Sequence, residues 1–236
     1  MKKYYIVGID EAGRWPWAGP VVAWWWMAEF TLANILLDSL DGLNDSKLLS
    51  AHRREFLYKQ IDVMAQSWKC WFSKASRDPI FIDTVGIREA NRQCMQDSIA
   101  TLLSYIDKED RVEIFIDGCD NYLFDLDEVD IWYDFQRQSR EKKLLSKPMT
   151  WRERIKIDYR IGWDKSCKAI SAASIIAKVT RDRIMCDFHA KYPVYGFDSH
   201  KGYGTRKHQD ALLHYGISPI HRKSYAPIKR LISVHS

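Results

Sequence analysis

Residues 4–28, YYIVGIDEAGRWPWAGPVVAWWWMA, decide the fold expected for this chain. Two apolar, β-rich runs, Tyr4–Asp10 and Val21–Ala28, flank a stretch with two glycines and two prolines, which predicts two paired strands joined by a long loop. Two adjacent acids, Asp10 and Glu11, stand where the first strand ends. Because successive residues of a regular strand point to opposite faces, the strand is expected to end or distort there if both acids serve one site.

Strand-like and helical patterns alternate through the rest of the chain. Further strands are predicted at 68–73, 111–117 and 155–161, and helices at 51–65 (with Ser50 as N-cap), 87–106, 169–188 and 207–215. Residues 120–154 are densely charged and are interpreted as an exposed insertion. The order of elements predicts one α/β domain over residues 1–200, followed by a basic helical C-terminal extension over residues 201–236.

Composition places the chain among soluble globular proteins. It has 236 residues, of which 46% are apolar and 28% charged, values that disfavour disordered and fibrous classes. No apolar run approaches the roughly 18 residues of a membrane span. The five cysteines are scattered without a C-x-x-C pair, as is typical of reduced thiols. We therefore predict a cytoplasmic protein that makes no contact with membranes.

The positive charge is concentrated at the C-terminal end. The net charge is +5, and residues 201–236 contain seven basic residues and one acid. Tyrosines and histidines are interleaved with these bases, among them Tyr203, Tyr225, His208 and His221. Such a segment is interpreted as a phosphate-binding surface with aromatic faces for sugars or bases, and the alternative is a solvated helix and tail.

Four acids share a context that indicates chemistry. Asp10, Glu11, Asp117 and Asp164 each stand at the end of an apolar run or shortly before a strong helical pattern, where α/β folds place sites. Clustered carboxylates repel one another and require a cation, and ligands that are all oxygen favour Mg²⁺ or Mn²⁺ over zinc. The alternative for any single aspartate is a cap of a turn or helix, an alternative weakened by the adjacency of Asp10 and Glu11.

Four sequence blocks, in order, resemble the ribonuclease HII family over nearly the whole chain. They are GIDEAGR with WAGPVVA at 8–23, LNDSKLLS at 43–50, ISAASIIAKVTRDR at 170–183, and HKGYGTRKH with GISPIHRKSY at 200–225. The resemblance implies a ribonuclease H-like α/β fold, with a mixed central sheet flanked by helices. A different nuclease of the same superfamily, of the transposase type, is disfavoured by the HKGYGT and SPIHR blocks.

The resemblance also implies an activity and roles for particular residues. The implied reaction is two-metal-ion cleavage of RNA in RNA–DNA hybrids, and of duplex DNA on the 5′ side of single embedded ribonucleotides, by a monomer that uses Mg²⁺ or Mn²⁺. The metal-binding acids would be Asp10, Glu11, Asp117 and Asp164. The substrate would be bound by Gly13, Arg14 and Trp15, which form the loop that reads the RNA–DNA junction, by Tyr203, which stacks on the sugar, and by Lys47, which contacts a phosphate.

Tryptophan replaces expected small residues at several positions. The family has Gly-Arg-Gly where this chain has Gly13-Arg14-Trp15, a second glycine where it has Trp163, and small residues where it has the run 24–26. Because TGA encodes stop, tryptophan or glycine in different genetic codes, we hypothesise that several of these positions are glycines decoded differently. The alternative is an impaired family member that binds RNA–DNA hybrids without cutting them efficiently, because the Trp15 indole obstructs close approach of the backbone.

Overall fold

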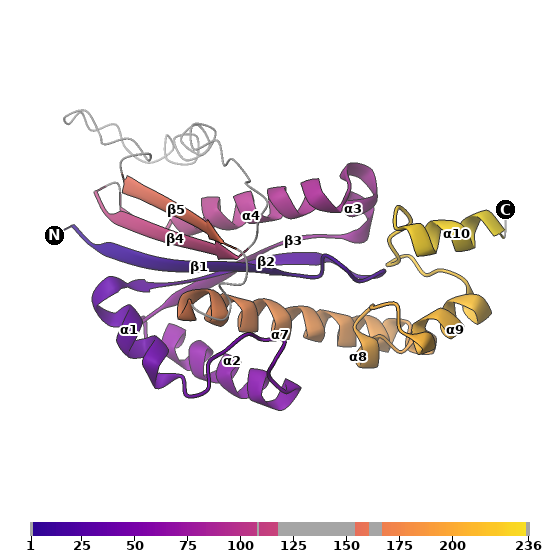
Figure 1. The fold of residues 1–236 in the computed structure, drawn as a ribbon, viewed down its shortest axis with the longest axis horizontal. Helices are drawn as coiled ribbons and strands as arrows, with labels where there is room; N and C mark the ends of the chain where they lie inside the picture. Colours follow the sequence, from indigo (N-terminus) through magenta and orange to yellow (C-terminus); the bar gives the residue numbers. More distant parts are fainter. Residues whose placement is uncertain (1, 108, 118–153, 161–166, 235–236) are drawn as a thin grey trace.

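A five-stranded mixed sheet lies at the centre of the computed structural model (Figure 1), which describes residues 2–107, 109–117, 154–160 and 167–234. Its strands are β1 (Tyr4–Ala12), β2 (Val21–Glu29), β3 (Trp71–Arg77), β4 (Arg111–Asp117) and β5 (Ile155–Arg160), in the spatial order β3-β2-β1-β4-β5. The pairs β1–β2 and β2–β3 are antiparallel, and the pairs β1–β4 and β4–β5 are parallel. The predicted mixed sheet is therefore confirmed.

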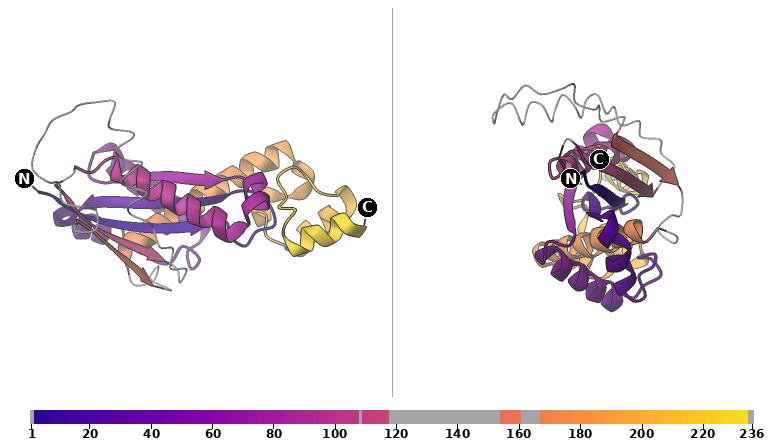
Figure 2. Two further views of the ribbon diagram at one scale, coloured as in Figure 1. Left: turned by 90° about the horizontal axis from the view of Figure 1, so that it is seen from above. Right: turned by 90° about the vertical axis from the view of Figure 1, so that its left-hand side faces the viewer.

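Helices cover both faces of the sheet. They are α1 (Phe30–Ser39), α2 (Ala51–Gln66), α3 (Pro79–Val85), α4 (Ile87–Leu103), α7 (Lys168–Lys191), α8 (Phe197–His200), α9 (Arg206–Tyr215) and α10 (Ala226–Val234), with a 3-10 turn at Pro193–Tyr195. Helix α4 lies on one face, whereas α1, α2 and α7 lie on the other (Figure 1). The two chain ends lie at opposite ends of the molecule, with α9 and α10 beyond the sheet (Figure 2). None of the described helices is long and apolar enough to cross a membrane.

Several sequence predictions need correction. The third strand is β3 rather than 68–73, because Trp68 occupies an exposed turn with a φ of 56°. Helices α1, α3, α8 and α10 were not predicted. The predicted N-cap is confirmed, since the Ser50 hydroxyl accepts a hydrogen bond from the Arg53 amide at 3.2 Å. The charged insertion at 120–154 lies almost wholly outside the described residues, and the domain boundary at residue 200 stays a prediction.

Helix α7 approaches strand β1 closely because residue 8 is a glycine. A Cβ atom on Gly8 would lie 2.1 Å from the carbonyl carbon and oxygen of Ala169. Backbone on both sides of this contact is rigid, so neither element can yield to a methyl group. The glycine thus fixes the spacing between α7 and the strand that carries Asp10 and Glu11.

Gly8→Ala is expected to lower the free energy of unfolding by about 3 kcal/mol, the upper range for overpacking a core. Gly86→Ala is the control, because a Cβ there meets nothing within 4 Å and the residue has only an unfavourable φ of 83°. The free energy of unfolding of Gly86→Ala is expected to fall by about 1 kcal/mol. Urea denaturation of both variants measures the difference, and equal losses would contradict the close approach.

Three consecutive tryptophans lie in the middle of the sheet. Trp24, Trp25 and Trp26 are all buried, with Trp25 packed on the α4 side and the other two on the α7 side, as strand alternation requires. The indole N–H groups of Trp24 and Trp25 have no hydrogen-bond partner among the described residues. Each such group costs about 1–3 kcal/mol. The fold therefore accommodates the run, but at a cost in buried polar groups.

The C-terminal region forms its own small core at the end of α7. Phe197, Leu212, Ile220 and Ile228 are buried there, together with Ala18 from the loop between β1 and β2. Four residues of the basic and aromatic segment are also buried or half-buried in this region: His208, His221, Arg222 and Tyr225. The interpretation of that whole segment as a surface is therefore wrong for these residues, whose side chains pack inward.

The buried histidines form a neutral hydrogen-bonded chain. The Nδ1 atom of His208 lies 3.0 Å from the Tyr203 carbonyl, its Nε2 atom lies 2.9 Å from His221 Nε2, and His221 Nδ1 accepts from the Ser218 amide at 2.8 Å. One proton on each ring, on His208 Nδ1 and on His221 Nε2, satisfies these three contacts. Burial lowers the pKa of His208 to about 4 and that of His221 to about 3. Repulsion from the His200 ring lowers both pKa values further, and repulsion from His208 also lowers that of His221.

We expect stability to fall as the pH drops below the ordinary histidine pKa of 6.5. The unfolded chain binds the proton more tightly than the folded chain. The contribution of His208 to the free energy of unfolding is therefore fully present above pH 6.5 and is lost as the pH falls to about 4. At pH 5 the loss is about 2 kcal/mol. The stability gap between the wild type and His208→Asn should narrow by this amount between pH 7.5 and pH 5. Chemical denaturation at both pH values measures it, with exposed His214→Asn as the control. A constant gap would contradict the neutral chain.

Candidate active site

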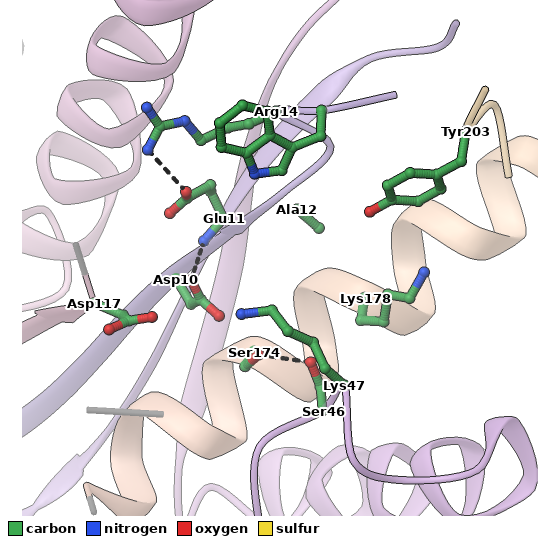
Figure 3. A pocket seen from close by; sticks show the side chains of 11 residues that line it. Asp10, Glu11, Ala12, Arg14, Ser46, Lys47, Asp117, Ser174, Lys178 and Tyr203 are labelled. Atoms are coloured by element: carbon green, nitrogen blue, oxygen red, sulfur yellow. Dashed lines mark hydrogen bonds and ion pairs between the residues drawn. The ribbon is translucent and has the colours of Figure 1, made fainter. Parts of the chain in front are cut away.

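Three predicted acids meet where β1 and β4 end. The parallel pairing of these strands runs to Ile9 opposite Ile116, and the next residues are Asp10 and Asp117. Asp10, Glu11 and Asp117 line one open pocket, whose empty space is about 600 Å³ when the adjoining open solvent is included (Figure 3). The antiparallel pairing of β1 with β2 continues to Ala12, so the strand does not end at the acids as expected. Instead, only its pairing with β4 stops before them.

Burial and mutual repulsion disfavour the charged forms of Asp10 and Glu11. Burial, together with repulsion from Glu11 and Asp117, raises the pKa of Asp10 well above its usual range. Asp10 Oδ1 accepts a hydrogen bond of 2.7 Å from the Glu11 amide. Burial also raises the pKa of Glu11, although Arg14 opposes this shift through an ion pair with 3.5 Å between Nη1 and Oε1. A site of this kind favours a cation.

Lys47 approaches the acids from a tightly hydrogen-bonded turn. The buried Asp45 carboxylate accepts from the Lys47 amide at 2.8 Å, and Arg54 Nη1 donates to the Ser46 carbonyl at 2.8 Å. Figure 3 shows the Lys47 side chain extending from this turn towards Asp10. The turn therefore presents a cation next to the carboxylates.

Helix α7 contributes two residues that the sequence analysis missed. Ser174 lies beside Asp10, where its hydrogen bond favours the charged carboxylate, and its hydroxyl lies 2.8 Å from that of Ser46. Lys178, one turn later, pairs with Asp182 at 2.7 Å, and its ammonium lies 5.8 Å from the centre of the Tyr203 ring. The sequence pattern that could have identified Ser174 and Lys178 is a serine and a lysine four residues apart, with only apolar residues between them, on a predicted helix.

The loop between β1 and β2 forms the rim of the pocket. Arg14 and Trp15 line it, and Tyr203 lines it from the turn before α9 (Figure 3). Gly13 has a φ of 101°, and a Cβ there would lie 2.4 Å from Arg181 Nε. Trp15 is 78% exposed and is not among the described residues with positive φ. Its side chain therefore occupies space at the rim without straining the backbone.

The structure gathers most of the predicted site residues. Those that line the pocket are Asp10, Glu11, Asp117, Arg14, Trp15, Lys47 and Tyr203. Gly13 belongs to the same loop but does not line the pocket. Asp164 and Trp163 lie outside the described residues, so the fourth carboxylate stays a prediction.

The donor chemistry of the pocket fits a hard divalent cation. Its charged acceptors are carboxylate oxygens, which Mg²⁺ and Mn²⁺ prefer, and the repulsion that raises the Asp10 pKa would be relieved by such an ion. No group of three acidic, histidine or cysteine side chains among the described residues is placed to hold a metal ion. The carboxylates that line the pocket therefore do not form a metal site by themselves, and Asp164, the fourth predicted ligand, lies outside the described residues.

Comparisons with known proteins identify the family of the chain. The family model described as Ribonuclease HII matches residues 7–228. Among curated relatives, the Ribonuclease HII of Acholeplasma laidlawii is 38% identical over 97% of this chain and 90% of its own length. The Ribonuclease HII of Cupriavidus necator is 35% identical over 97% of this chain and 79% of its own length.

A solved structure shows the same fold. The crystal structure of ribonuclease H2 from Pyrococcus horikoshii superposes with a TM-score of 0.66 and covers 98% of both chains. Its sequence is 22% identical to this chain, so the likeness concerns the fold alone.

Proposed function

The chain belongs to the ribonuclease HII family, and from this membership we propose that it cuts the RNA strand of RNA–DNA hybrids and cuts duplex DNA on the 5′ side of single embedded ribonucleotides. At the coarser level, it is a ribonuclease H, a metal-dependent endoribonuclease that acts on RNA–DNA. The finer proposal rests on one observation. Asp10, Glu11 and Asp117 line one pocket where the pairing of β1 with β4 ends, beneath a rim formed by Arg14 and Tyr203.

In this proposal the acids Asp10, Glu11, Asp117 and Asp164 hold two Mg²⁺ or Mn²⁺ ions. The chemistry that two such ions supply when bound is polarisation of the attacking water and of the scissile phosphate, with 5′-phosphate and 3′-hydroxyl ends as products. Ser174 stabilises the charged form of Asp10 by its hydrogen bond. The ion pair between Arg14 and Glu11 orients the rim loop over the same carboxylates.

The remaining residues of the pocket would bind and read the nucleic acid. Lys47 and Lys178 place two ammonium groups where backbone phosphates would lie. Tyr203 is 41% exposed beside Lys178, and its ring is available to stack on the sugar at the junction. The loop of Gly13, Arg14 and Trp15 would sense the 2′-hydroxyl, the group that distinguishes a ribonucleotide from DNA.

One observation favours the second candidate function, binding without efficient cleavage. The Trp15 indole is 78% exposed on the rim that nucleic acid must approach. An indole there would hold the backbone of the substrate away from the carboxylates. An impaired enzyme of this kind would still bind hybrids through Lys47, Lys178 and Tyr203.

An endonuclease assay tests the proposal. The substrate is a labelled DNA duplex with one ribonucleotide, and the controls are an all-DNA duplex and a reaction with EDTA. Cleavage 5′ of the ribonucleotide with Mg²⁺ or Mn²⁺, and none in either control, is the expected result. Tight binding without cleavage would favour the second candidate, and neither binding nor cleavage would refute both.

A further inference from the structure

The rim loop, residues 13–20, is attached to the C-terminal region by main-chain hydrogen bonds. The Arg222 amide donates to the Trp17 carbonyl at 2.8 Å, and the Gly19 amide donates to the Ile220 carbonyl at 2.9 Å. Ala18 and His221 form an antiparallel bridge between these bonds. Residues 220–222 therefore run alongside the rim loop, although about two hundred residues separate them in the chain.

The Arg222 side chain lies beneath the rim loop and is fully buried. Its guanidinium donates to three carbonyls of the loop: Nη2 to Gly13 at 2.6 Å, Nη1 to Arg14 at 3.1 Å, and Nε to Gly19 at 2.9 Å. A buried charge is costly unless its donors are satisfied, and here the carbonyl dipoles of the rim loop satisfy them. The guanidinium thus fixes the directions of three peptide groups at once.

Tyr225 completes this arrangement. Its hydroxyl donates to the Arg14 carbonyl and accepts from Arg222 Nη1 at 2.7 Å, and its ring centre lies 5.1 Å from the guanidinium carbon. Burial raises the pKa of Tyr225, so the hydroxyl keeps the proton that it donates. The Arg14 carbonyl consequently accepts two hydrogen bonds from one buried pair.

The two halves of the rim loop have different supports. In the second half, the buried Arg181 donates to the carbonyls of Ala18 and Pro20, each at 3.1 Å, and Arg222 donates only to the Gly19 carbonyl between them. The described side-chain bonds to the carbonyls of Gly13 and Arg14 come from Arg222 and Tyr225. Gly13 and Arg14 are the residues that read the RNA–DNA junction in the proposed function.

We propose that Arg222 and Tyr225 are positioning residues that set the orientation of Gly13 and Arg14, and hence the selectivity for a single ribonucleotide. The inference rests on the proposed function, in which this loop contacts the junction. A duplex with one ribonucleotide offers a single 2′-hydroxyl, so its recognition depends on a correctly oriented loop. A long hybrid offers a 2′-hydroxyl at every position of its RNA strand and is less sensitive to the loop.

Tyr225→Phe tests the proposal, because it removes only the hydroxyl and keeps the ring that packs in the core. We expect KM for the single-ribonucleotide duplex to rise about five-fold, the effect of losing the one hydrogen bond that the hydroxyl donates to the rim loop, with a smaller rise for the long hybrid. The kcat values should change little because the carboxylates are untouched. The control is Tyr215→Phe, which alters an exposed ring in α9 and should leave both KM values unchanged.

Hydrogen exchange gives a readout that does not depend on activity. In Tyr225→Phe, faster amide exchange is expected in residues 13–20, with the rest of the sheet unchanged. Equal losses on both substrates, accompanied by faster exchange throughout the protein, would overturn the positioning role. Unchanged KM ratios and unchanged exchange would overturn it as well. If the wild type cut neither substrate, the proposed function would fail, whereas the exchange result would still decide whether the hydroxyl holds the loop.

Discussion

Asp10→Asn is expected to abolish metal-dependent cleavage while leaving binding of an RNA–DNA hybrid within about two-fold. Loss of one anionic ligand from the carboxylate group removes several kcal/mol of charge stabilisation, which corresponds to a rate loss of about a thousand-fold or more. Binding is expected to persist because Lys47, Lys178 and Tyr203 are unchanged. Single-turnover cleavage and fluorescence anisotropy measure the two quantities.

The same variant should not be destabilised in the absence of metal. Burial and the charges of Glu11 and Asp117 already disfavour the charged form of Asp10, so the neutral amide relieves repulsion. We expect the Tm of metal-free Asp10→Asn to equal or exceed that of the wild type, which separates a catalytic loss from unfolding. Asp187→Asn, the same change at an exposed position of α7, is the matched control and should retain full activity. Cleavage by Asp10→Asn at the wild-type rate would refute the metal-binding role.

Trp15→Gly is expected to raise kcat/KM on a single-ribonucleotide duplex by about ten-fold or more, equivalent to at least about 1.4 kcal/mol of transition-state stabilisation. The substitution removes an indole that is 78% exposed on the rim of the pocket. Close approach of the loop backbone to the nucleic acid then becomes possible.

A matched control exists elsewhere on the surface. Trp68 is 77% exposed in the turn before β3, away from the pocket, and its φ of 56° suits glycine. Trp68→Gly should therefore leave cleavage unchanged. An unchanged or lower rate in Trp15→Gly would count against obstruction by the indole.

The coding sequence gives an independent test of the tryptophan hypothesis. TGA codons at positions 15 and 163 would support glycines decoded differently, whereas TGG codons at both would refute it. One structural observation also supports the hypothesis. The buried indole N–H groups of Trp24 and Trp25 lack hydrogen-bond partners among the described residues. Small residues at these positions of β2 would leave no buried donor unsatisfied.

Local sequence patterns predicted the elements that contain their own signals. The strands β1, β2 and β4 were predicted because their apolar runs are continuous and β-rich, and α2 because Ser50 caps an amphipathic run. Helix α1 was missed because it has no side-chain N-cap and exposes the large apolar residues Phe30 and Ile35, so no clean periodicity marks it. The predicted range of strand β3 began three residues too near the N-terminus, because Trp68, which lies in a turn, resembles part of an apolar run in the sequence.

The sequence by itself indicated the acids that follow apolar strand-like runs, and its resemblance to the ribonuclease HII family pointed to Lys47 and Tyr203. Only the tertiary structure decided which of these residues meet. Parallel pairing brings Asp117 beside Asp10, and the packing of α7 on Gly8 places Ser174 and Lys178 at the same pocket. Arg222, 209 positions from Gly13, counts as surface charge in the sequence but is buried under the rim loop. The physical reason is that burial and hydrogen-bond partners depend on which distant segments the fold packs together, whereas strand and helix signals depend on neighbours in the chain.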